Sequence, residues 1–428
     1  MFPNAHSAWH PIKKRFINAT YLTMSQCGVH VRSADRVGPT LPSSPTFIDL
    51  FAGCGGLSLG LMQAGWTGLF AIEKDKFAFE TLSANLCAPD RSISAFDWPD
   101  WLPREPTSVG AFSRKYAAQL KKLRGSVDLL VGGPPCQGFS SAGRRDPNDP
   151  RNQLMADYLR VVRLVQPKLV LVENVRGMTL DFTDSHHPVN YADKLVRSLA
   201  KDYRVQSRVL NLSAFGVPQN RSRLFIVGIA KECGLMPEDI FSELDGVRRG
   251  ILRAKGLVRP VSAKSAISDL EVRRNGVVAN AVMPRFDDIK YLRPLTQYQK
   301  LMRVGATGAP TDTRLARHTA EVAARFRKII RSCQEDGRLN VSIGPSLRER
   351  FGLKKHAIRV LDPDEPAPTI TSMPDDLLHY DEPRTLTVRE NARLQSFPDW
   401  FEFRGKYTTG GHLRKIQVPR FTQVANAV

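Results

Sequence analysis

The stretch FIDLFAGCGGLSLG, residues 47–60, decides the fold class. An apolar strand is followed by a turn that contains Gly53, Gly55 and Gly56, and a helix begins directly after the turn. In α/β proteins such a turn brings the backbone close to a ligand at the carboxyl edge of a parallel sheet. The pattern is not a dinucleotide fingerprint, because Ser58 stands where the third glycine is required. A tight turn without a ligand is the alternative for this segment taken alone.

Strand-like and helix-like segments alternate from Thr46 to about residue 230. Strands are predicted in FIDLF, GLFAIE, VDLLVGG, KLVLVENV, YRVQSRVLN and RLFIVGIA. Helices are predicted in LGLMQAGW, FAFETLSANL, YLRVVRLVQ and YADKLVRSLAKD. This alternation is the βαβ signature and predicts an α/β fold with a doubly wound, mostly parallel sheet.

The segments on either side of the predicted sheet differ from it in composition. Residues 1–45 are polar and basic, and we expect them to form a flexible extension. Residues 240–375 are rich in arginine and contain only short apolar runs, which indicates a separate lobe. The last segment, 376–428, contains LTVRENARLQSF, whose apolar spacing predicts a helix.

The charge of the chain points to a polyanionic partner. The 428 residues contain 62 Lys and Arg against 42 Asp and Glu, a net charge of +20. Residues 241–360 alone contain 25 basic and 11 acidic residues, a net charge of +14. Nucleic acid is therefore the expected partner. The sequence has no apolar run of about 18 residues and no secretory pattern at its start, so we expect no membrane contact and a cytoplasmic location.

Composition also excludes several classes of protein. Apolar residues make up 42% and charged residues 24% of the chain, which is typical of a globular protein and not of a collagen-like or disordered one. The six cysteines are widely spaced and form no CxxC pair. We therefore expect reduced thiols, with neither a zinc site nor a disulfide framework.

Two acidic residues follow strands in positions that suit a nucleoside. Glu73 stands twenty residues after Gly53, at the end of the next strand, where it can accept hydrogen bonds from both ribose hydroxyls. Asp97, in SAFDW, could bond the adenine amino group. Together with the glycine turn, these residues favour an adenosine-containing cofactor without a pyrophosphate, of which S-adenosylmethionine is the common one. A solvated glutamate at a strand end is the alternative.

A cysteine stands at the end of a third predicted strand. In VDLLVGGPPCQGFSSAGRRD, Pro134 and Pro135 fix the backbone immediately before Cys136. A rigid position at the edge of a sheet suits a nucleophilic thiolate, although a structural cysteine is the alternative. The polar segment that follows, to about Asn152, is predicted to be a mobile loop that closes over a substrate. Its Arg144 and Arg145 are expected to reach phosphates.

Two further motifs complete the candidate site. Glu173, in ENV, ends the KLVLV strand, and a carboxyl group beside a cysteine nucleophile can protonate or hydrogen-bond a ring nitrogen. Arg221 and Arg223, in QNRSR, alternate with polar residues and would point to one face of an extended chain. Contact with a phosphate and exposure on a solvated edge are both compatible with that spacing.

Taken in order, these motifs resemble the cytosine-5 DNA methyltransferase family of restriction-modification systems. The resemblance extends from about residue 46 to the end of the chain. FIDLFAGCGGLSLG is similar to the cofactor loop of the family, and GGPPCQGFS to its catalytic loop. ENV, QNRSR, RTLTVRENARLQSFP and QVPRFTQVANAV follow in the order of the family.

The resemblance implies a mechanism. Cys136 would attack carbon 6 of a cytosine flipped out of the duplex, which a stacked base would not permit. Glu173 would bond ring nitrogen 3 and the exocyclic amine, and Arg223 would hold the carbonyl oxygen. Arg221 would support the catalytic loop. Carbon 5 would then take a methyl group from S-adenosylmethionine.

The resemblance also implies a cofactor site and a domain plan. The fold would be a Rossmann-like, S-adenosylmethionine-dependent methyltransferase sheet at 46–239, with a target-recognition domain at 240–375 and a segment at 376–428 that returns to the catalytic domain. Phe51 would contact the adenine, Glu73 the ribose and Asp97 the adenine amine, while Asn426 would close the site. The other expected cofactor-binding residues are Gly53, Gly55 and Pro135.

The implied partners are double-stranded DNA and a cognate restriction endonuclease that acts on the same site. We expect a monomer in the bacterial cytoplasm, associated with the nucleoid. Two features depart from the family: residues 1–45 match nothing in it, and Ala425 replaces a glycine shortly before the end at Val428. From the second we expect the chain to be cut short.

Other functions fit parts of the sequence. A tRNA cytosine-5 methyltransferase of the same fold would use the same chemistry, but the long basic lobe favours duplex DNA. A cofactor-binding regulator without catalysis does not require both Cys136 and Glu173. A nicotinamide oxidoreductase is disfavoured by Ser58, and a DNA-binding module without enzymatic activity leaves the cysteine loop unexplained.

Overall fold

A computed structural model describes most of the chain. The described residues are 44–87, 95–135, 152–180, 190–257, 259–353, 357–409, 413 and 416–427. The predicted flexible extension therefore lies outside them except for its last two residues, as do Cys136 and the predicted mobile loop after it. The chain divides into two compact units. The first comprises Met1–Asp75, Leu86–Leu210 and Ser222–Ile251, and the second Lys76–Asn85, Asn211–Arg221 and Leu252–Val428.

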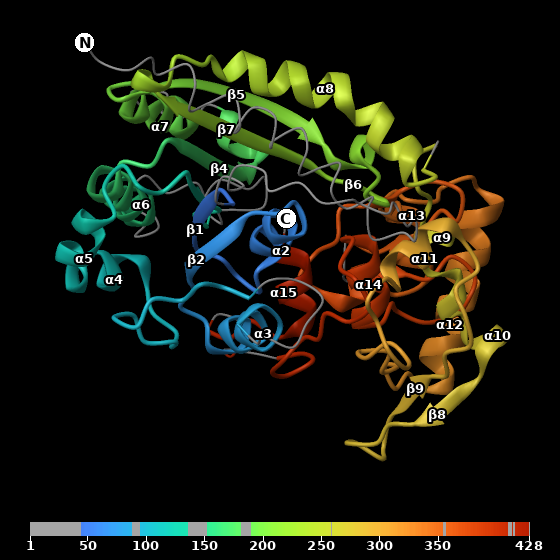
Figure 1. Ribbon diagram of the computed structural model, residues 1–428. Coiled ribbons are helices and arrows are strands. Elements are labelled where there is room, and N and C mark those ends of the chain that lie inside the picture. Colours follow the sequence, from blue (N-terminus) through green and yellow to red (C-terminus); the bar gives the residue numbers. More distant parts are fainter. Residues whose placement is uncertain are drawn as a thin grey trace, which may run out of the picture. The chain divides into compact units, whose positions relative to one another are not determined.

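The first unit is built on a six-stranded sheet of the order β2-β1-β3-β4-β7-β5 (Figure 1). In that order the strands are Thr67–Ile72, Thr46–Leu50, Leu129–Gly132, Leu169–Val175, Ser222–Ala230 and Tyr203–Asn211. Neighbouring strands from β2 to β4 are parallel, whereas β4 and β7 are antiparallel. The predicted α/β fold with a mostly parallel sheet is thus confirmed.

The central strands form because their apolar side chains are buried on both faces of the sheet. Phe47, Ile48, Leu130 and Val131 have no solvent exposure. Such continuous apolar runs are typical of parallel strands covered by helices. The helices of the first unit are α2 (Gly56–Gln63), α4 (Val109–Lys115), α5 (Ala117–Lys122), α6 (Asn152–Val165), α7 (Tyr191–Leu199) and, as far as Ile251, α8 (Pro237–Ala254).

The second unit collects short helices and strands from distant parts of the sequence. Its helices are α3 (Lys76–Leu86), α9 (Ala263–Ile267), α10 (Val272–Asn275), α11 (Gln297–Met302), α12 (Ala320–Glu335), α13 (Pro345–Arg350), α14 (Val388–Leu394) and α15 (Arg420–Asn426). Its strand pairs are β6 (Gln219–Asn220) with β11 (Ala367–Pro368), β8 (Val277–Ala279) with β9 (Asp287–Ile289), and β10 (Arg359–Val360) with β12 (Leu377–Leu378). One apolar cluster surrounds α9 and α14, and another surrounds α12.

Two long helices beyond residue 230 were not predicted. They are α8 (Pro237–Ala254) and α12. The sequence does carry a signal for α12, because Phe326, Ile329, Ile330 and Cys333 have helical spacing and are all buried. The high arginine content of this region hid that spacing, since long basic side chains alternate with the apolar ones.

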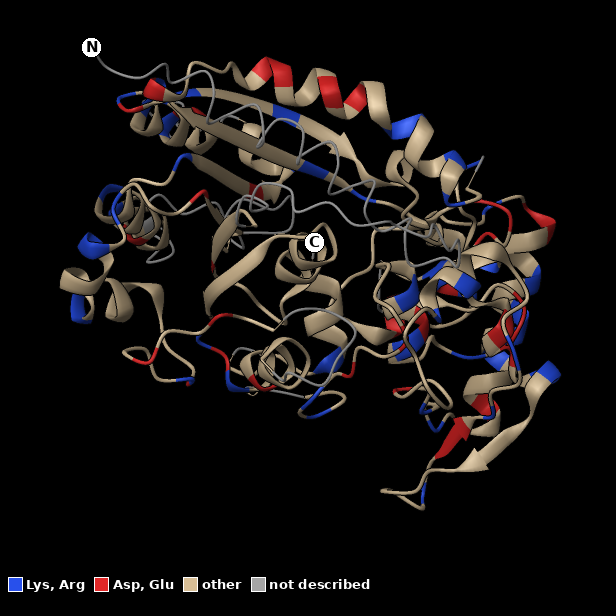
Figure 2. Cartoon of the chain, viewed as in Figure 1, with Lys and Arg blue, Asp and Glu red and all other residues tan. Residues whose placement is uncertain are grey.

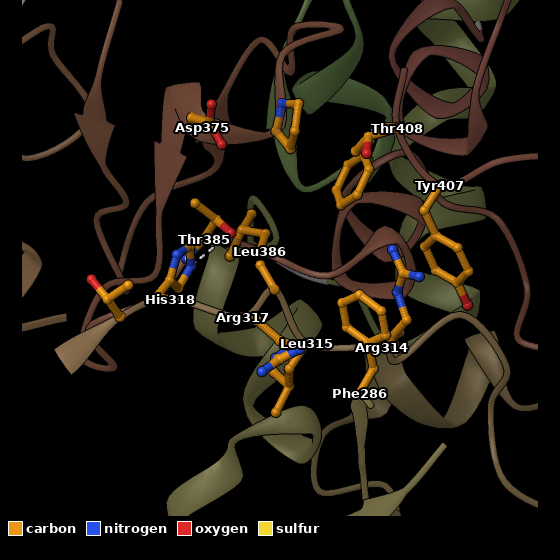
Figure 3. Close-up of a pocket in the computed structure, with 14 residues that line it drawn as sticks. Phe286, Arg314, Leu315, Arg317, His318, Asp375, Thr385, Leu386, Tyr407 and Thr408 are labelled. Atoms are coloured by element: carbon orange, nitrogen blue, oxygen red, sulfur yellow. Dashed lines mark hydrogen bonds between the residues drawn. The ribbon is translucent and has the colours of Figure 1, made fainter. Parts of the chain in front are cut away.

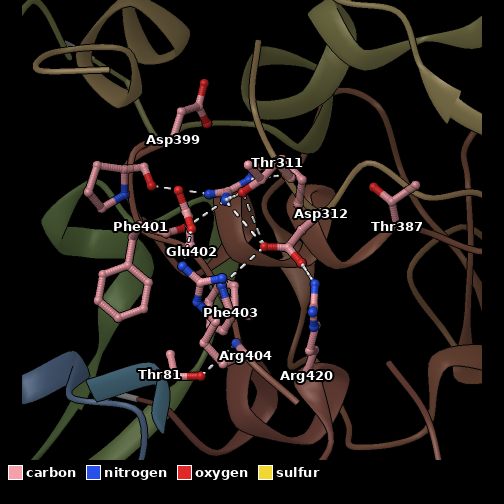
Figure 4. Close-up of polar contacts among 12 residues, drawn as sticks. Thr81, Thr311, Asp312, Thr387, Asp399, Phe401, Glu402, Phe403, Arg404 and Arg420 are labelled. Carbon is pink, nitrogen blue, oxygen red and sulfur yellow. Dashed lines mark hydrogen bonds and ion pairs between the residues drawn. The ribbon is translucent and has the colours of Figure 1, made fainter. Parts of the chain in front are cut away.

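A buried ionic network fixes the C-terminal segment inside the second unit (Figure 4). The Asp312 carboxylate pairs with Arg420 at 2.7 Å, accepts the backbone N–H of Phe403 at 3.2 Å and lies 3.6 Å from Arg389. The segment also bonds a helix more than 300 residues earlier in the chain, because the Thr81 hydroxyl donates to the Gln423 side chain at 2.6 Å. Residues 376–428 therefore pack with α3, which belongs to the range predicted to be catalytic. The assignment of the ranges to named domains stays a prediction.

None of the described helices is both long enough and apolar enough to cross a membrane.

Candidate active site

The carboxyl ends of β3 and β4 hold the candidate catalytic groups. In the antiparallel pair of β4 and β7, Val175 lies opposite Arg223 and Glu173 lies opposite Phe225. Opposed residues share a face of the sheet, so Glu173 and Arg223 are diagonal neighbours on one face. The Arg223 Nε lies 3.0 Å from the Glu173 Oε1, and the two side chains are only 11% and 9% exposed. The ion pair between Glu173 and Arg223 was not predicted, and it is buried.

The segment that leads to Cys136 lies against this ion pair. A Cβ atom added to Gly133 would lie 3.2 Å from the Glu173 Oε2, so the backbone passes directly over the carboxylate. The Asn174 side-chain amide donates to the Pro134 carbonyl at 3.1 Å and fixes the start of the turn. Sequence reasoning chose Glu173 from ENV but missed the role of Asn174. Cys136 lies outside the described residues, and the described chain stops at the half-buried Pro135, immediately before it.

Arg221 has a different environment from Arg223. It lies between β6 and β7, where the extended chain is interrupted, so the two arginines do not alternate along one strand. Arg221 is buried, and its Nη2 donates to the carbonyl oxygens of Ala425 at 3.0 Å and Ala427 at 2.9 Å. The structure thus ties Arg221 to the end of α15. Its support of the catalytic loop stays a prediction, because that loop lies outside the described residues.

The glycine-rich turn after β1 has backbone angles that glycine adopts more readily than other residues. Gly53 and Gly55 have φ angles of +58° and +92°, which side chains with a Cβ rarely adopt. Phe51 also has a positive φ of +58°, an uncommon conformation for a bulky residue. No atom of the described residues lies within 4 Å of a Cβ built on Gly53, so they leave open space over the turn.

Glu73 and the turn are joined directly. The Gly53 N–H donates to the Glu73 Oε2 at 2.9 Å, and the N–H groups of Lys74 and Asp75 donate to Oε1 at 2.8 and 2.7 Å. Burial raises the pKa of Glu73, and these three hydrogen bonds oppose the rise. A carboxylate has about four lone-pair positions, so roughly one, on Oε2, is left for a ligand.

Ser58, the residue that breaks the dinucleotide pattern, has a partner of its own. Its hydroxyl donates to the Asp49 Oδ2 at 2.5 Å, and both residues are fully buried. Burial raises the pKa of Asp49 to about 7. This pair links β1 to α2 beneath the turn. Sequence reasoning missed it, because Ser58 was considered only as the residue in place of the third glycine and Asp49 was not considered at all.

The remaining predicted cofactor-binding residues lie apart in the sequence. Asp97 is exposed, and its backbone N–H donates to the Gly68 carbonyl at 2.8 Å, next to β2. Asn426 is exposed and is the last residue of α15, in the second unit. The structure therefore shows direct contact only between Gly53 and Glu73 among the described members of the predicted set. Phe51, Gly55, Asp97 and Pro135 belong to the same unit as that pair.

These groups fit the adenosine part of S-adenosylmethionine. A carboxylate acceptor at Glu73, an exposed carboxylate at Asp97 and open space at Gly53 match ribose hydroxyls and an amino group, which are hydrogen-bond donors. These acceptors thus agree with the cofactor expected from the sequence.

The described cysteines were tested as alternative nucleophiles. Cys54, Cys87, Cys233 and Cys333 are reduced cysteines. Burial raises the pKa of Cys54 to about 12 and that of Cys233 to about 11, so neither thiol ionises near neutral pH. Cys54, although it lies in the glycine-rich turn, is therefore a poor nucleophile.

Comparison with known proteins extends these observations. The family model described as C-5 cytosine-specific DNA methylase matches residues 45–428. The Type II methyltransferase M.DdeI of Desulfomicrobium norvegicum is 33% identical over 394 residues, which cover 89% of this chain and 85% of that protein. The Type II methyltransferase M1.HphI of Haemophilus parahaemolyticus is 30% identical, with coverage of 90% and 83%.

A solved structure agrees with the sequence comparisons. A protein encoded within an E. coli prophage, provisionally assigned as a DNA modification methyltransferase, superposes with a TM-score of 0.60 at 26% identity, covering 90% of this chain and 95% of that one. The family match spans both compact units and includes every candidate residue described above. This chain belongs to the family of C-5 cytosine-specific DNA methylases.

Proposed function

We propose that this chain is a Type II modification methyltransferase that methylates carbon 5 of cytosine in a specific duplex DNA sequence. The observation that carries the proposal is the buried pair of Glu173 and Arg223, held under the Gly133–Pro135 segment that leads to Cys136. The buried carboxylate, the arginine and the start of the cysteine segment come from three strands and meet at one edge of the sheet.

In the proposed reaction, the Cys136 thiolate forms a covalent bond to carbon 6 of the flipped cytosine. Electron density moves towards ring nitrogen 3, where the Glu173 carboxyl group holds the proton. Arg223 fixes the direction of that carboxyl group through its Nε. Carbon 5 becomes nucleophilic, and after methylation the loss of its proton and of the Cys136 thiolate restores the aromatic ring.

S-adenosylmethionine is the proposed methyl donor, and it supplies an electrophilic methyl group when it is bound. Glu73 would accept a ribose hydroxyl through its remaining Oε2 position, and the Gly53 turn would leave room for the nucleoside. Phe51, Gly55, Asp97, Pro135 and Asn426 complete the proposed set.

Duplex DNA is the proposed substrate form. The net charge of +14 within residues 241–360 supports it, since contacts with phosphates supply much of the affinity of proteins for DNA. Figure 2 shows lysine and arginine positions, coloured blue, along the helices and loops of the second unit. By analogy with the relatives named above, we further propose a cognate endonuclease at the same sequence. A monomer is proposed because one target-recognition range accompanies one catalytic range.

The test is methyl transfer from labelled S-adenosylmethionine to separate samples of duplex DNA and tRNA, followed by sequencing for 5-methylcytosine. Label in cytosine of duplex DNA, at one recurring sequence, is the expected result. Label confined to tRNA, or absent from both, would contradict the proposal.

A pair of cysteine variants tests the proposed nucleophile. Cys136→Ser should abolish methyl transfer, because a serine hydroxyl does not supply a thiolate, while S-adenosylmethionine still binds in calorimetry. Cys87→Ser, a half-buried cysteine at the end of α3, is the matched control and should keep its activity. Near-normal turnover by the first variant would disprove the covalent step.

A further inference from the structure

The second unit contains an open pocket of about 690 Å³ with aromatic and basic walls (Figure 3). We refer to it as the basic pocket and define it by Phe286, Arg314, Arg317, His318 and Tyr407. These side chains come from the β8–β9 hairpin, from the segment before α12 and from the C-terminal segment. All of these segments belong to the second unit.

Arg314 is held between two aromatic rings at the wall of the basic pocket. The carbon at the centre of its guanidinium group lies 3.6 Å from the centre of the Tyr407 ring and 4.2 Å from that of the Phe286 ring. Stacking of this kind attracts the cation and fixes the plane of the group. Burial lowers the pKa of Arg314, which shows that the group is already partly desolvated.

The N–H edge of Arg314 has little to bind within the protein. In the part of the chain that the structure describes, its one hydrogen bond runs from Nη1 to the Met283 Sδ at 3.1 Å, and a thioether is a weak acceptor. A guanidinium group has five N–H donors in a fixed planar fork. Most of these donors therefore remain for a ligand in the pocket.

Arg420 provides a contrast on the same ring. Its guanidinium carbon lies 4.3 Å from the centre of the Tyr407 ring, but its Nε donates to the Gly405 carbonyl at 2.9 Å and its Nη1 to Asp312 at 2.7 Å. Arg420 is thus committed to the protein. Of the two arginines that stack on Tyr407, only Arg314 keeps its fork largely unused.

We infer that Arg314 reads a guanine of the recognition sequence through paired hydrogen bonds to the O6 and N7 atoms in the major groove. The inference rests on the proposed function. Guanine presents two adjacent acceptors on that edge, whereas every other base presents at least one donor or a methyl group there, and arginine is the side chain that most often reads the guanine pattern. Asp375 lines the same pocket, and its carboxylate would repel a phosphate more than a base edge.

The experiment compares the sequences that the full chain methylates. A random duplex library is treated with the wild type, with Arg314→Lys, with Arg314→Ala and with the control Arg420→Lys, and methylated cytosines are mapped by bisulfite sequencing. Lysine keeps the charge and can stack on the rings but lacks the planar fork. The lysine variant therefore tests the role of the fork even if the alanine variant does not fold.

Both Arg314 variants should lose the preference for guanine at one position, on the order of 10- to 100-fold, while other positions stay unchanged. Arg420→Lys should lower the melting temperature and keep the sequence preference. A uniform fall in methylation across all sequences would identify Arg314 as a phosphate contact and overturn the inference. So would unchanged preference in the Arg314 variants, or a recognition sequence without guanine. If the wild type methylates no DNA, the proposed function itself has failed.

Discussion

The ion pair of Glu173 and Arg223 is buried, so replacing only one of the two residues should lower the stability of the fold. Removing one partner of a buried pair leaves the other charge without compensation, whereas removing both leaves no buried charge. Single and double substitutions of these two residues therefore separate the effect on stability from the effect on catalysis.

The Arg223→Ala variant should have a free energy of unfolding about 3 to 5 kcal/mol below that of the wild type, because the buried Glu173 carboxylate loses the cation that it pairs with. Its methyl transfer should also be lost. Urea unfolding and incorporation of labelled methyl groups measure the two effects.

The double variant Glu173→Gln with Arg223→Met serves as the control. It should regain most of the stability, since no unpaired charge remains, and stay inactive, since the carboxyl group is gone. A single variant as stable as the wild type would show that the ion pair is not buried in solution.

Asp49 predicts a pH dependence of stability. Its pKa is about 7 in the folded chain against a reference value of 3.8. Between pH 4 and 7 the folded chain therefore holds a proton that the unfolded chain has lost, so the free energy of unfolding should fall as pH rises, by up to about 1.4 kcal/mol per pH unit. Above pH 7 this contribution should be constant.

The matching variant is Asp49→Asn, which keeps an acceptor for the Ser58 hydroxyl but does not titrate. Its stability relative to the wild type should rise through the same pH range in urea unfolding. Parallel pH profiles for the two proteins would contradict the raised pKa of Asp49.

At the scale of the elements, three glycines have different packing. A Cβ at Gly132, in β3, would lie 2.8 Å from the Leu50 carbonyl of β1, so the backbone of the central sheet would have to shift. A Cβ at Gly133 would lie 3.2 Å from the end of the Glu173 side chain and 3.9 Å from the Glu173 carbonyl oxygen. A Cβ at Gly60, in α2, would meet none of the described residues within 4 Å.

These contacts predict that alanine has a different effect on stability at each of the three positions. Gly132→Ala should destabilise the chain strongly, and Gly133→Ala should leave the fold intact but slow methyl transfer by displacing the carboxylate. Gly60→Ala, the matched control, should be active and about 0.5 to 1 kcal/mol more stable, because glycine within a helix loses more entropy on folding than alanine. Thermal melting and labelled methyl transfer separate the three, and an unimpaired Gly133→Ala enzyme would show that the segment over Glu173 is not restrictive.

At the scale of the whole molecule, the range predicted to recognise DNA is tied to the C-terminal segment through Asp312. That residue lies within 240–375, while its partners Arg389, Phe403 and Arg420 lie beyond it. Exchange of the 240–375 range removes Asp312 unless the replacement also has an aspartate at that position. Without it, Arg389 and Arg420 would lose the carboxylate that they share.

We predict that a chimera carrying the 240–375 range of a relative methylates the sequence of that relative, provided that an aspartate is kept at the position of Asp312. A chimera without that acid should be less stable by several kcal/mol, as expected when buried arginines lose a partner. Bisulfite sequencing and urea unfolding give the two results. An unchanged target sequence in a folded chimera would place base recognition outside this range.

Local pattern was sufficient for the strands of the first unit. The six strands of its sheet and the turn at Gly53 follow from period and turn chemistry, which depend on neighbouring residues. The helices α4, α5 and α8 were not predicted. Glu73 and Glu173 could be chosen because strands of known direction place their carboxyl ends at one edge. The family motifs gave the reaction, and the comparisons confirmed it.

Only the tertiary structure shows which side chains contact each other when they lie far apart in the sequence. The break between Arg221 and Arg223, the Asn174 bond to Pro134 and the contact of Thr81 with Gln423, 342 residues apart, leave no trace in local spacing. Only three-dimensional packing distinguishes Arg420, which is bound to Asp312, from Arg314, whose side-chain hydrogen bond in the described part of the chain goes to the Met283 sulfur. Sequence by itself determined the fold class and the chemistry, because both rest on short motifs; the partners of individual charged side chains depend on packing between distant segments, which no short motif records.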